Sequence, residues 1–269
     1  MKKKLFALAT AAVMMLSCLA LAACGSSSTE GSATESDLAY VQDKGTLVVG
    51  ITDFAPMDYK DEDGNWQGFD ADLSKAYAES IGVEVEFIEI NWDSKEMELE
   101  NKNIDCVWNG MTLTDGVKEA METSNPYCNN AQVVVVNKDK ADGIKSVEDC
   151  ADLAFVVEAG SAGEEQANAN GFNSTGVETQ ADAVMEVAAG TADACVIDSL
   201  MAGAMVGEGT SYPDLQATIG LNEELYGVGF RKGSDMAASL NDFLKTAYED
   251  GTIMELAEKY GTKDAIIEQ

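Results

Sequence analysis

The main part of this chain alternates apolar strands with amphipathic helices, and the whole alternation occurs twice. In the first round, the residue pattern predicts strands at 46–51, 83–90, 104–109 and 133–137 and helices at 70–80 and 94–102. In the second round, it predicts strands at 153–157, 176–179 and 194–197 and helices at 162–169 and 181–189. Strands that are apolar on both faces and separated by helices are typical of parallel sheets covered on both sides. We therefore expect an α/β protein.

A short unit repeated in both rounds divides the chain into two lobes. Residues 101–107 contain a turn after a helix, an Asp and the start of a buried strand, and residues 190–196 repeat that order. A further strand at 226–230 and a helical pair over 235–260, broken at Gly251, follow. If that strand returns to the first sheet, two connections join the lobes and form a hinge. We expect residues 38–136 with 226–269 in lobe 1 and residues 137–225 in lobe 2.

The N-terminus carries a basic stretch, Lys2–Lys4, and an apolar run, Leu5–Leu21, before Leu-Ala-Ala-Cys at 21–24. This layout resembles a bacterial lipoprotein signal, which implies that residues 1–23 are removed and that Cys24 is lipidated. Residues 25–37 hold no large apolar side chain, and this composition predicts a flexible tether over residues 24–37. We expect a lipid anchor at the extracytoplasmic face of the cell membrane. The alternative is an uncleaved anchor, although the run falls short of the ~20 residues of a spanning helix.

Charge and composition exclude several classes of function. The net charge of −31 becomes −34 once the three lysines of residues 1–23 are removed, so no basic face is available for nucleic acid. The chain has no histidine, which excludes Ser-His-Asp and Cys-His hydrolysis and His-ligated zinc. Carboxylate-only catalysis stays open.

Four cysteines follow Cys24, at 106, 128, 150 and 195, and their spacing matches no CxxC motif for zinc or redox chemistry. Cys106 and Cys195 lie in apolar strands, where free cysteine behaves as a small buried hydrophobe. We expect buried thiols, with Cys106–Cys128 as the first pair to check if a disulfide exists. Neither a metal nor a cofactor is expected.

Several dispersed stretches occur in an order that resembles a known family. They are Leu47–Gly50, Phe54–Tyr59, Asp63–Leu73, Asn103–Asp105, Gly110–Thr114, Ser124–Tyr127, Ala192–Ala194, Asp198 and Tyr226–Gly233. Together they are similar to the amino-acid-type (family 3) periplasmic solute-binding proteins of ABC importers. The resemblance implies a two-lobed type II fold, each lobe a mostly parallel sheet covered by helices, with a hinge between the lobes. It also implies a monomer without enzymatic activity that closes on an amino acid or similar small polar solute and delivers it to an ABC permease.

Ligands in open α/β sheets bind beyond the carboxyl ends of the strands, and in a two-lobed protein those ends face the cleft. The candidate ligand-binding residues are Asp53, Phe54, Trp92, Asn109, Gly110, Met111, Thr112, Thr114, Lys118, Glu158, Gly160, Ser161, Ala162 and Asp198. The resemblance implies an aromatic contact from Phe54, carboxylate contacts from residues 109–112 and an ammonium contact from Asp198.

Simpler structural roles exist for several of these residues. Phe54 could be an ordinary core side chain, and Trp92 could lie at the rim without contacting a solute. Ser161 could act only as an N-cap, although the N–H groups after it could also receive an anion. Asp198 could cap a helix over 199–206.

The match fails at one informative position. The family places an arginine that grips the solute carboxylate where this chain has Val117, and the only arginine in the chain is Arg231. Either Lys118, backbone N–H groups and Thr112 hold that carboxylate, or the solute lacks it. In the second case the solute is an amine, a polyamine or a modified amino acid, and Asp53, Glu158 and Asp198 near Phe54 select its cationic end. A dehydratase-like enzyme that uses Glu158 and Asp198 is a second alternative. A tethered sensory adaptor is a third.

Overall fold

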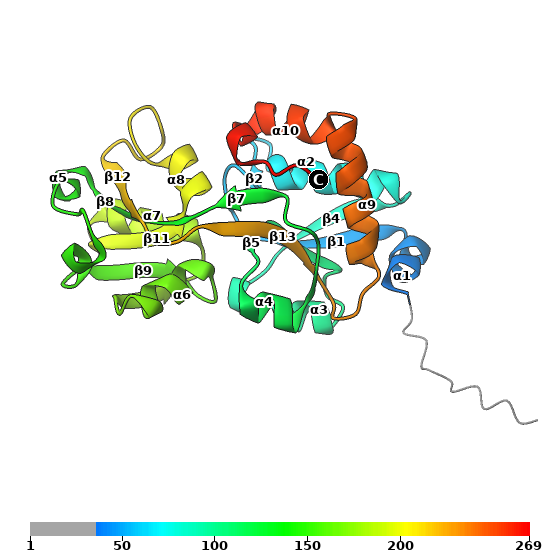
Figure 1. Ribbon diagram of the computed structural model, residues 1–269, viewed down its shortest axis with the longest axis horizontal. Coiled ribbons are helices and arrows are strands. Elements are labelled where there is room, and N and C mark those ends of the chain that lie inside the picture. Colours follow the sequence, from blue (N-terminus) through cyan, green and yellow to red (C-terminus); the bar gives the residue numbers. More distant parts are fainter. Residues whose placement is uncertain (1–35) are drawn as a thin grey trace, which may run out of the picture. The chain divides into compact units, whose positions relative to one another are not determined.

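The computed structural model describes residues 36–269, so the predicted signal peptide, Cys24 and most of the predicted tether lie outside the described part. These residues form two open sheets, and a two-stranded hairpin of β2 (Tyr59–Lys60) and β3 (Trp66–Gln67) follows the first strand (Figure 1). Within residues 36–269, no helix combines the length and the apolar character needed to span a membrane.

The first sheet has the strand order β4-β1-β5-β13-β6, with β7 also paired to β13. Its strands are β1 (Thr46–Ile51), β4 (Glu84–Glu89), β5 (Cys106–Thr112), β6 (Glu122–Thr123), β7 (Cys128–Asn130) and β13 (Glu224–Phe230). Strands β4, β1 and β5 are parallel, whereas β13 runs antiparallel to β5. The late strand therefore does return to the first sheet, as predicted.

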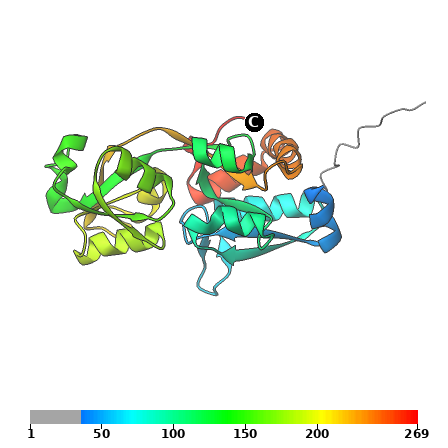
Figure 2. The same cartoon turned by 90° about the horizontal axis from the view of Figure 1, so that it is seen from below.

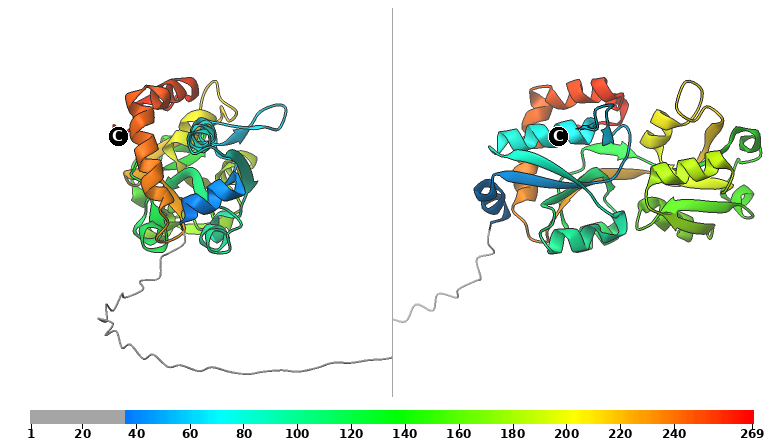
Figure 3. Two further views of the ribbon diagram at one scale, coloured as in Figure 1. Left: turned by 90° about the vertical axis from the view of Figure 1, so that its right-hand side faces the viewer. Right: turned by 180° about the vertical axis from the view of Figure 1, so that it is seen from behind.

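Side chains of β1 point alternately to two faces of this sheet, and each face has its own helices. Leu47, Val49 and Ile51 share an apolar cluster with α2, α9 and α10, whereas Val48 packs with residues of α3 and α4. The helices on this sheet are α1 (Asp37–Lys44), α2 (Phe69–Ser80), α3 (Lys95–Glu100), α4 (Asp115–Ala120), α9 (Met236–Glu249) and α10 (Thr252–Tyr260). The right-hand view of Figure 3 shows α2 and α10 on one side of the strands.

The second sheet has the order β10-β9-β11-β8-β12. Its strands are β8 (Gln132–Asn137), β9 (Ala154–Glu158), β10 (Asn173–Val177), β11 (Ala194–Asp198) and β12 (Leu215–Gly220). Helix α6 (Ala162–Ala169) covers one face, and α7 (Gln180–Ala189) and α8 (Ser199–Met205) cover the other. A short α5 (Lys138–Ala141) follows β8, and single 3-10 turns lie at η1 (Trp92–Ser94), η2 (Val147–Cys150) and η3 (Lys263–Ala265).

The strand predicted at 133–137 is present as β8, but the prediction that lobe 1 extends to residue 136 is wrong. Strand β8 pairs antiparallel with β11 and β12 in the second sheet, and the chain crosses between the sheets directly after β7 (Figure 2). An apolar run shows that a strand is buried, but its neighbours and direction depend on residues far along the chain. We therefore use lobe 1 for residues 36–130 and 224–269 and lobe 2 for residues 131–223.

The cysteines after Cys24 are all buried and none is paired with another, as predicted. Cys106, Cys128 and Cys195 belong to one apolar cluster and Cys150 to another. Burial raises the pKa of the Cys106, Cys128 and Cys195 thiols, so these side chains are neutral packing elements.

Candidate functional site

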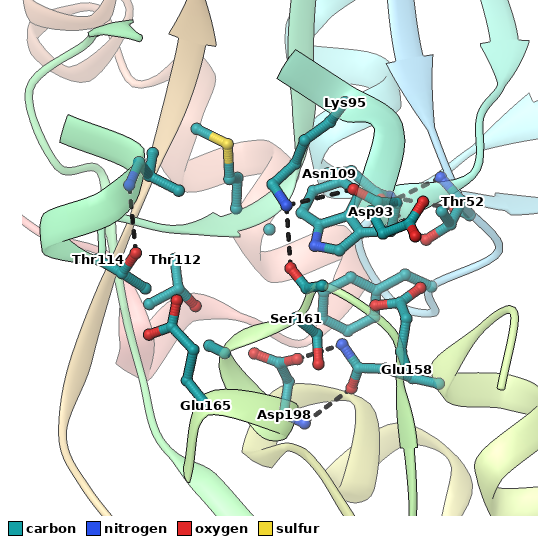
Figure 4. Close-up of a pocket in the computed structure, with 18 of the residues that line it drawn as sticks. Thr52, Asp93, Lys95, Asn109, Thr112, Thr114, Glu158, Ser161, Glu165 and Asp198 are labelled. Carbon is teal, nitrogen blue, oxygen red and sulfur yellow. Dashed lines mark hydrogen bonds between the residues drawn. The ribbon is translucent and has the colours of Figure 1, made fainter. Parts of the chain in front are cut away.

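A cavity of about 240 Å³ lies where the carboxyl ends of strands from both sheets meet (Figure 4). It is lined by Thr52, Phe54, Trp92, Asp93, Lys95, Glu96, Asn109, Gly110, Met111, Thr112, Thr114, Gly116, Val117, Glu158, Gly160, Ser161, Ala162, Glu165, Gln180 and Asp198. In Figure 4 Lys95 and Asn109 of lobe 1 face Glu158 and Asp198 of lobe 2. The rule that ligands gather beyond strand ends therefore locates this cavity.

Twelve of the fourteen predicted ligand-binding residues line the cavity, and Asp53 and Lys118 do not. Asp53 is exposed between two cavity residues, Thr52 and Phe54, because side chains alternate along an extended segment. Lys118 is exposed on α4, one helical step of about 100° away from the buried, cavity-lining Val117. Lys118 therefore lies outside the cavity lining in this structure.

Eight cavity residues were missed by sequence reasoning: Thr52, Asp93, Lys95, Glu96, Gly116, Val117, Glu165 and Gln180. Asp93 and Lys95 follow β4 directly after Trp92. Including the three residues after Trp92 among the strand-end candidates would have identified both. Glu165 and Gln180 come from helices α6 and α7, and only the packing of these helices brings them to the cavity. No local pattern marks them.

Phe54 forms an aromatic wall of the cavity together with Tyr226 behind it. The two rings meet edge to face, with centroids 6.3 Å apart. Gly110 makes this possible, because its φ is +54° and a Cβ there would lie 2.4 Å from the Phe54 ring. Phe54 is thus part of the core and of the cavity wall at once.

The polar groups of β5 that face the cavity are largely occupied by the protein itself. The Asn109 amide donates to the Thr52 carbonyl at 3.1 Å and to Asp58 Oδ2 at 2.7 Å, and its Oδ1 accepts from Thr52. The Gly110 N–H donates to Asp70 Oδ2 at 2.6 Å. The Thr112 hydroxyl donates to Glu224 Oε1 at 2.9 Å. The resemblance assigns residues 109–112 to a solute carboxylate, but these three donors already have acceptors.

The start of α6 is capped by its own side chains. Ser161 Oγ accepts from the Glu164 N–H at 3.1 Å, so the N-cap interpretation of Ser161 is confirmed. Glu164 in turn accepts from the Gly160 N–H at 2.8 Å. This carboxylate of the protein therefore engages the N–H that precedes the N-cap, not the N–H groups of Ala162 and Gly163 at the start of the helix.

Asp198 ends β11 on the floor of the cavity and accepts hydrogen bonds from four side chains. Its Oδ1 accepts from the Tyr226 hydroxyl at 2.6 Å, from Gln132 Nε2 at 3.0 Å and from Asn130, and its Oδ2 accepts from Gln180. It occupies the N-cap position of α8 without a side-chain bond to the helix. Burial, together with nearby Glu224, raises the pKa of Asp198 to about 8.

Glu158, at the end of β9, is the second buried acid on this floor. Its Oε1 is buried and has no hydrogen-bond partner anywhere in residues 36–269. Burial, with a contribution from Asp198, raises the pKa of Glu158 to about 8, whereas Lys95 acts in the opposite direction. A buried carboxyl oxygen without a partner is costly, and a bound cation or N–H donor would remove that cost.

Lobes 1 and 2 touch at the edge of the cavity. Lys95 Nζ donates to the Gly160 carbonyl at 2.9 Å across the two lobes and to the Trp92 carbonyl at 3.2 Å within lobe 1. Gly160 has a φ of +71°, and a Cβ on it would lie 2.6 Å from Asp93 Cα. These contacts close one side of the cavity.

Comparison with known proteins agrees with this geometry. Residues 47–263 match the family described as bacterial extracellular solute-binding proteins, family 3. The arginine-binding extracellular protein ArtP of Bacillus subtilis is 31% identical over 97% of this chain and 99% of its own length. The L-cystine-binding protein TcyJ of Escherichia coli K12 is 29% identical over 91% of this chain and 94% of its own length.

A solved structure shows the same fold. The crystal structure of the ancestral amino-acid-binding protein AncCDT-1, described as a precursor of cyclohexadienyl dehydratase, superposes with a TM-score of 0.76. It is 35% identical in sequence and covers 84% of this chain and 99% of its own. The two-lobed type II periplasmic-binding-protein fold expected from the sequence is thereby confirmed.

Proposed function

We propose that this chain, which belongs to the bacterial extracellular solute-binding proteins of family 3, captures a cationic amino acid or a similar small cationic solute and delivers it to an ABC permease. The observation that carries the proposal is the number of carboxyl groups in the cavity lining. Five carboxyl side chains line it, from Asp93, Glu96, Glu158, Glu165 and Asp198, against the single ammonium group of Lys95. Such a lining favours a solute with at least one cationic group.

The size of the cavity supports a small solute. At about 240 Å³ it lies below the range of ~300–1,000 Å³ that is typical of pockets for drug-sized ligands. Glu158 offers the unpartnered Oε1 for the cationic group, and Asp198 lies beside it on the same floor. The Phe54 ring adds a flat apolar contact and a favourable face for a cation.

Thermal unfolding with a panel of amino acids, polyamines and other small amines tests this function. At ~100 times its dissociation constant, a solute that binds only the folded chain should raise the free energy of unfolding by about 2.7 kcal/mol. Stabilisation by basic amino acids such as arginine would support the proposal. Stabilisation by polyamines alone would support the amine alternative, and stabilisation only by acidic or neutral solutes would contradict a cationic ligand.

Capture would occur by closure of the two lobes around the solute. The chain crosses between the sheets at two places, after β7 and before β13, which suits a hinge (Figure 1). Gly160 belongs to lobe 2, whereas its neighbours Lys95 and Asp93 belong to lobe 1. These contacts therefore form only when the two lobes are close together.

We expect Gly160→Ala to weaken binding of whichever amino acid stabilises the wild type most. The new Cβ meets Asp93 and holds the lobes apart, and we expect a loss of affinity of about tenfold or more by isothermal titration calorimetry. Gly171→Ala is the matched control, because Gly171 has the same φ of +71° and open space around its Cβ position. Equal losses of affinity in the two variants would argue against the closure contact.

The proposal is for binding without turnover. The relatives described above are named as binding proteins. Recovery of the unchanged solute after denaturation would support binding, and recovery of a chemically changed product would support the dehydratase-like alternative.

We also propose a monomer anchored at the extracytoplasmic face of the cell membrane through lipid on Cys24. Because Cys24 lies outside the described residues, the support for this is the sequence layout of residues 1–24. We expect Cys24→Ser to move the protein from the membrane fraction to the soluble fraction, measured by fractionation and by the mass of the mature N-terminus. Cys106→Ser is the control, since that thiol is buried in the core. An unchanged distribution of Cys24→Ser would contradict the anchor.

A further inference from the structure

Lys95 is the one cationic side chain among the residues that line the cavity. It begins α3, directly after the 3-10 turn that carries Trp92, and only 7% of its surface is exposed. The position that the family resemblance assigns to an arginine holds Val117, and Arg231 lies elsewhere, with its Nε bonded to Asp37 Oδ2 at 3.0 Å. Lys95 is therefore the one cationic side chain of the cavity lining that can pair with an anionic group of a bound solute.

The ammonium group of Lys95 is poorly compensated within the protein. Its hydrogen-bond acceptors are two carbonyl oxygens, those of Trp92 and Gly160, and Nζ lies 5.0 Å from the centroid of the Trp92 ring. It forms no ion pair with any carboxylate of the described chain, although Asp93, Glu96, Glu158 and Glu165 lie further off around it. An ammonium group has three N–H donors, so one is left for another partner. A buried cation in this state gains from a carboxylate.

The donors of β5 that could compete for a carboxylate, and the N–H of Gly160, already have acceptors. The N–H of Gly110 is bonded to Asp70, the hydroxyl of Thr112 to Glu224, and the N–H of Gly160 to Glu164. The Asn109 amide is bonded to Thr52 and Asp58. A carboxylate placed against β5 would have to displace these bonds, whereas at Lys95 it would add one.

We infer that Lys95 binds the carboxylate of the solute, while Glu158 and Asp198 bind its cationic end. This inference rests on the proposed function and narrows the class of solute. The solute class is then a small molecule that carries both a carboxylate and a cationic group, and simple polyamines are excluded. The carboxylate lies at the Trp92 and Gly160 side of the cavity, not against α4. A lysine acts as a point charge, so the carboxylate is held with less angular restriction than an arginine fork would impose.

The test compares amino acids with their decarboxylated partners. Isothermal titration calorimetry is run on the wild type and Lys95→Met with L-arginine and agmatine, L-lysine and cadaverine, and L-histidine and histamine. Methionine keeps an unbranched stem and removes the charge. Lys95→Met loses a charge-assisted contact with the carboxylate, so we expect it to bind each amino acid that the wild type binds about 10- to 100-fold more weakly. Its affinity for the corresponding amine should fall less than about threefold.

A matched control and a rescue variant make the result specific. Lys232→Met is the control, because Lys232 Nζ also donates to two carbonyls, those of Lys118 and Met121, but lies outside the cavity lining. Adding Val117→Arg to Lys95→Met should restore affinity for the amino acids only. Thermal unfolding of each ligand-free variant shows that it is folded.

Several results would overturn the inference. An equal loss for both members of a pair would mean that Lys95 acts only in lobe closure through Gly160, and no loss would mean that it does not contact the solute. Wild-type binding of the amines with no preference for the amino acids would reject the carboxylate site while leaving capture of a cation intact. A wild type that binds none of the six compounds would contradict the proposed function itself, and with it the inference.

Discussion

Asp198→Ala should destabilise the ligand-free protein more than the other substitutions considered for the cavity. Removing the carboxyl group takes away the acceptor of the Gln180 and Tyr226 side chains. It also removes one of the two acceptors of Asn130 and of Gln132, which keep Glu224. Each stranded donor costs about 1–3 kcal/mol before the site relaxes, so a fall of about 3–5 kcal/mol in the free energy of unfolding is expected. Urea unfolding at pH 7 measures it, and the same variant should lose detectable binding of a cationic solute.

Asp193→Ala is the control for this effect. Asp193 precedes the same strand, is 39% exposed at its side chain and pairs with Lys140 at 2.6 Å. An exposed pair contributes less than about 1 kcal/mol, so this variant should unfold close to the wild type. Similar destabilisation of the two variants would mean that the buried network around Asp198 does not carry the stability assigned to it.

The ligand-free protein should lose stability as the pH rises from about 4.5 to about 8. Burial raises the pKa of both Glu158 and Asp198 to about 8, above the ordinary carboxyl values of 4.5 and 3.8. Between those limits the folded chain holds protons that the unfolded chain has released, so each step up in pH favours the unfolded state. The decrease ends near pH 8, where the folded state releases the same protons.

Glu158→Gln isolates the contribution of Glu158 to this pH dependence of stability. Glutamine stays neutral at every pH, so relative to the wild type this variant should gain up to a few kcal/mol of stability between pH 5 and pH 8. Urea unfolding at pH 5, 6, 7 and 8 measures the difference. Glu165→Gln, which removes a carboxyl from the exposed edge of the same cavity, is the control. Parallel curves for the wild type and Glu158→Gln would contradict a protonated Glu158.

Solute binding should show the opposite trend with pH. A cationic solute prefers the ionised carboxyls, so its affinity should rise between pH 6 and pH 8 and its binding should release protons at pH 7. Calorimetry in buffers of different ionisation enthalpy counts those protons. Glu158→Gln should bind the cation far more weakly and release fewer protons, and an unchanged proton count would mean that Glu158 does not face the cationic group.

The cavity floor and the crossing strands share one hydrogen-bond network. Glu224 starts β13, where the chain re-enters lobe 1, and its Oε1 accepts from Thr112, from Asn130 at 2.6 Å and from Gln132 at 2.8 Å. Asn130 and Gln132 also donate to Asp198. A change of charge at Asp198 therefore acts directly on the residues at which the chain passes from one lobe to the other.

Sequence reasoning predicted most elements to within a few residues, because strands and helices follow local periodicity. The strand predicted at 46–51 is β1, the break at Gly251 separates α9 from α10, and Ser161 caps α6. It also located the cavity, since a strand end can be identified from the strand itself. The error at β8 shows the limit, because the same Val-rich run fits either sheet and either direction until its partners are known.

The sequence by itself therefore determined the α/β class, the two rounds of strands and helices, and the strand ends that form the site. Only the tertiary structure decided which polar groups there are available to a solute. Gly110 meets Asp70, 40 residues earlier in the chain, and Lys95 meets Gly160, 65 residues later. Hydrogen bonds between residues so far apart depend on the packing of whole lobes, and no local pattern of residues encodes that packing.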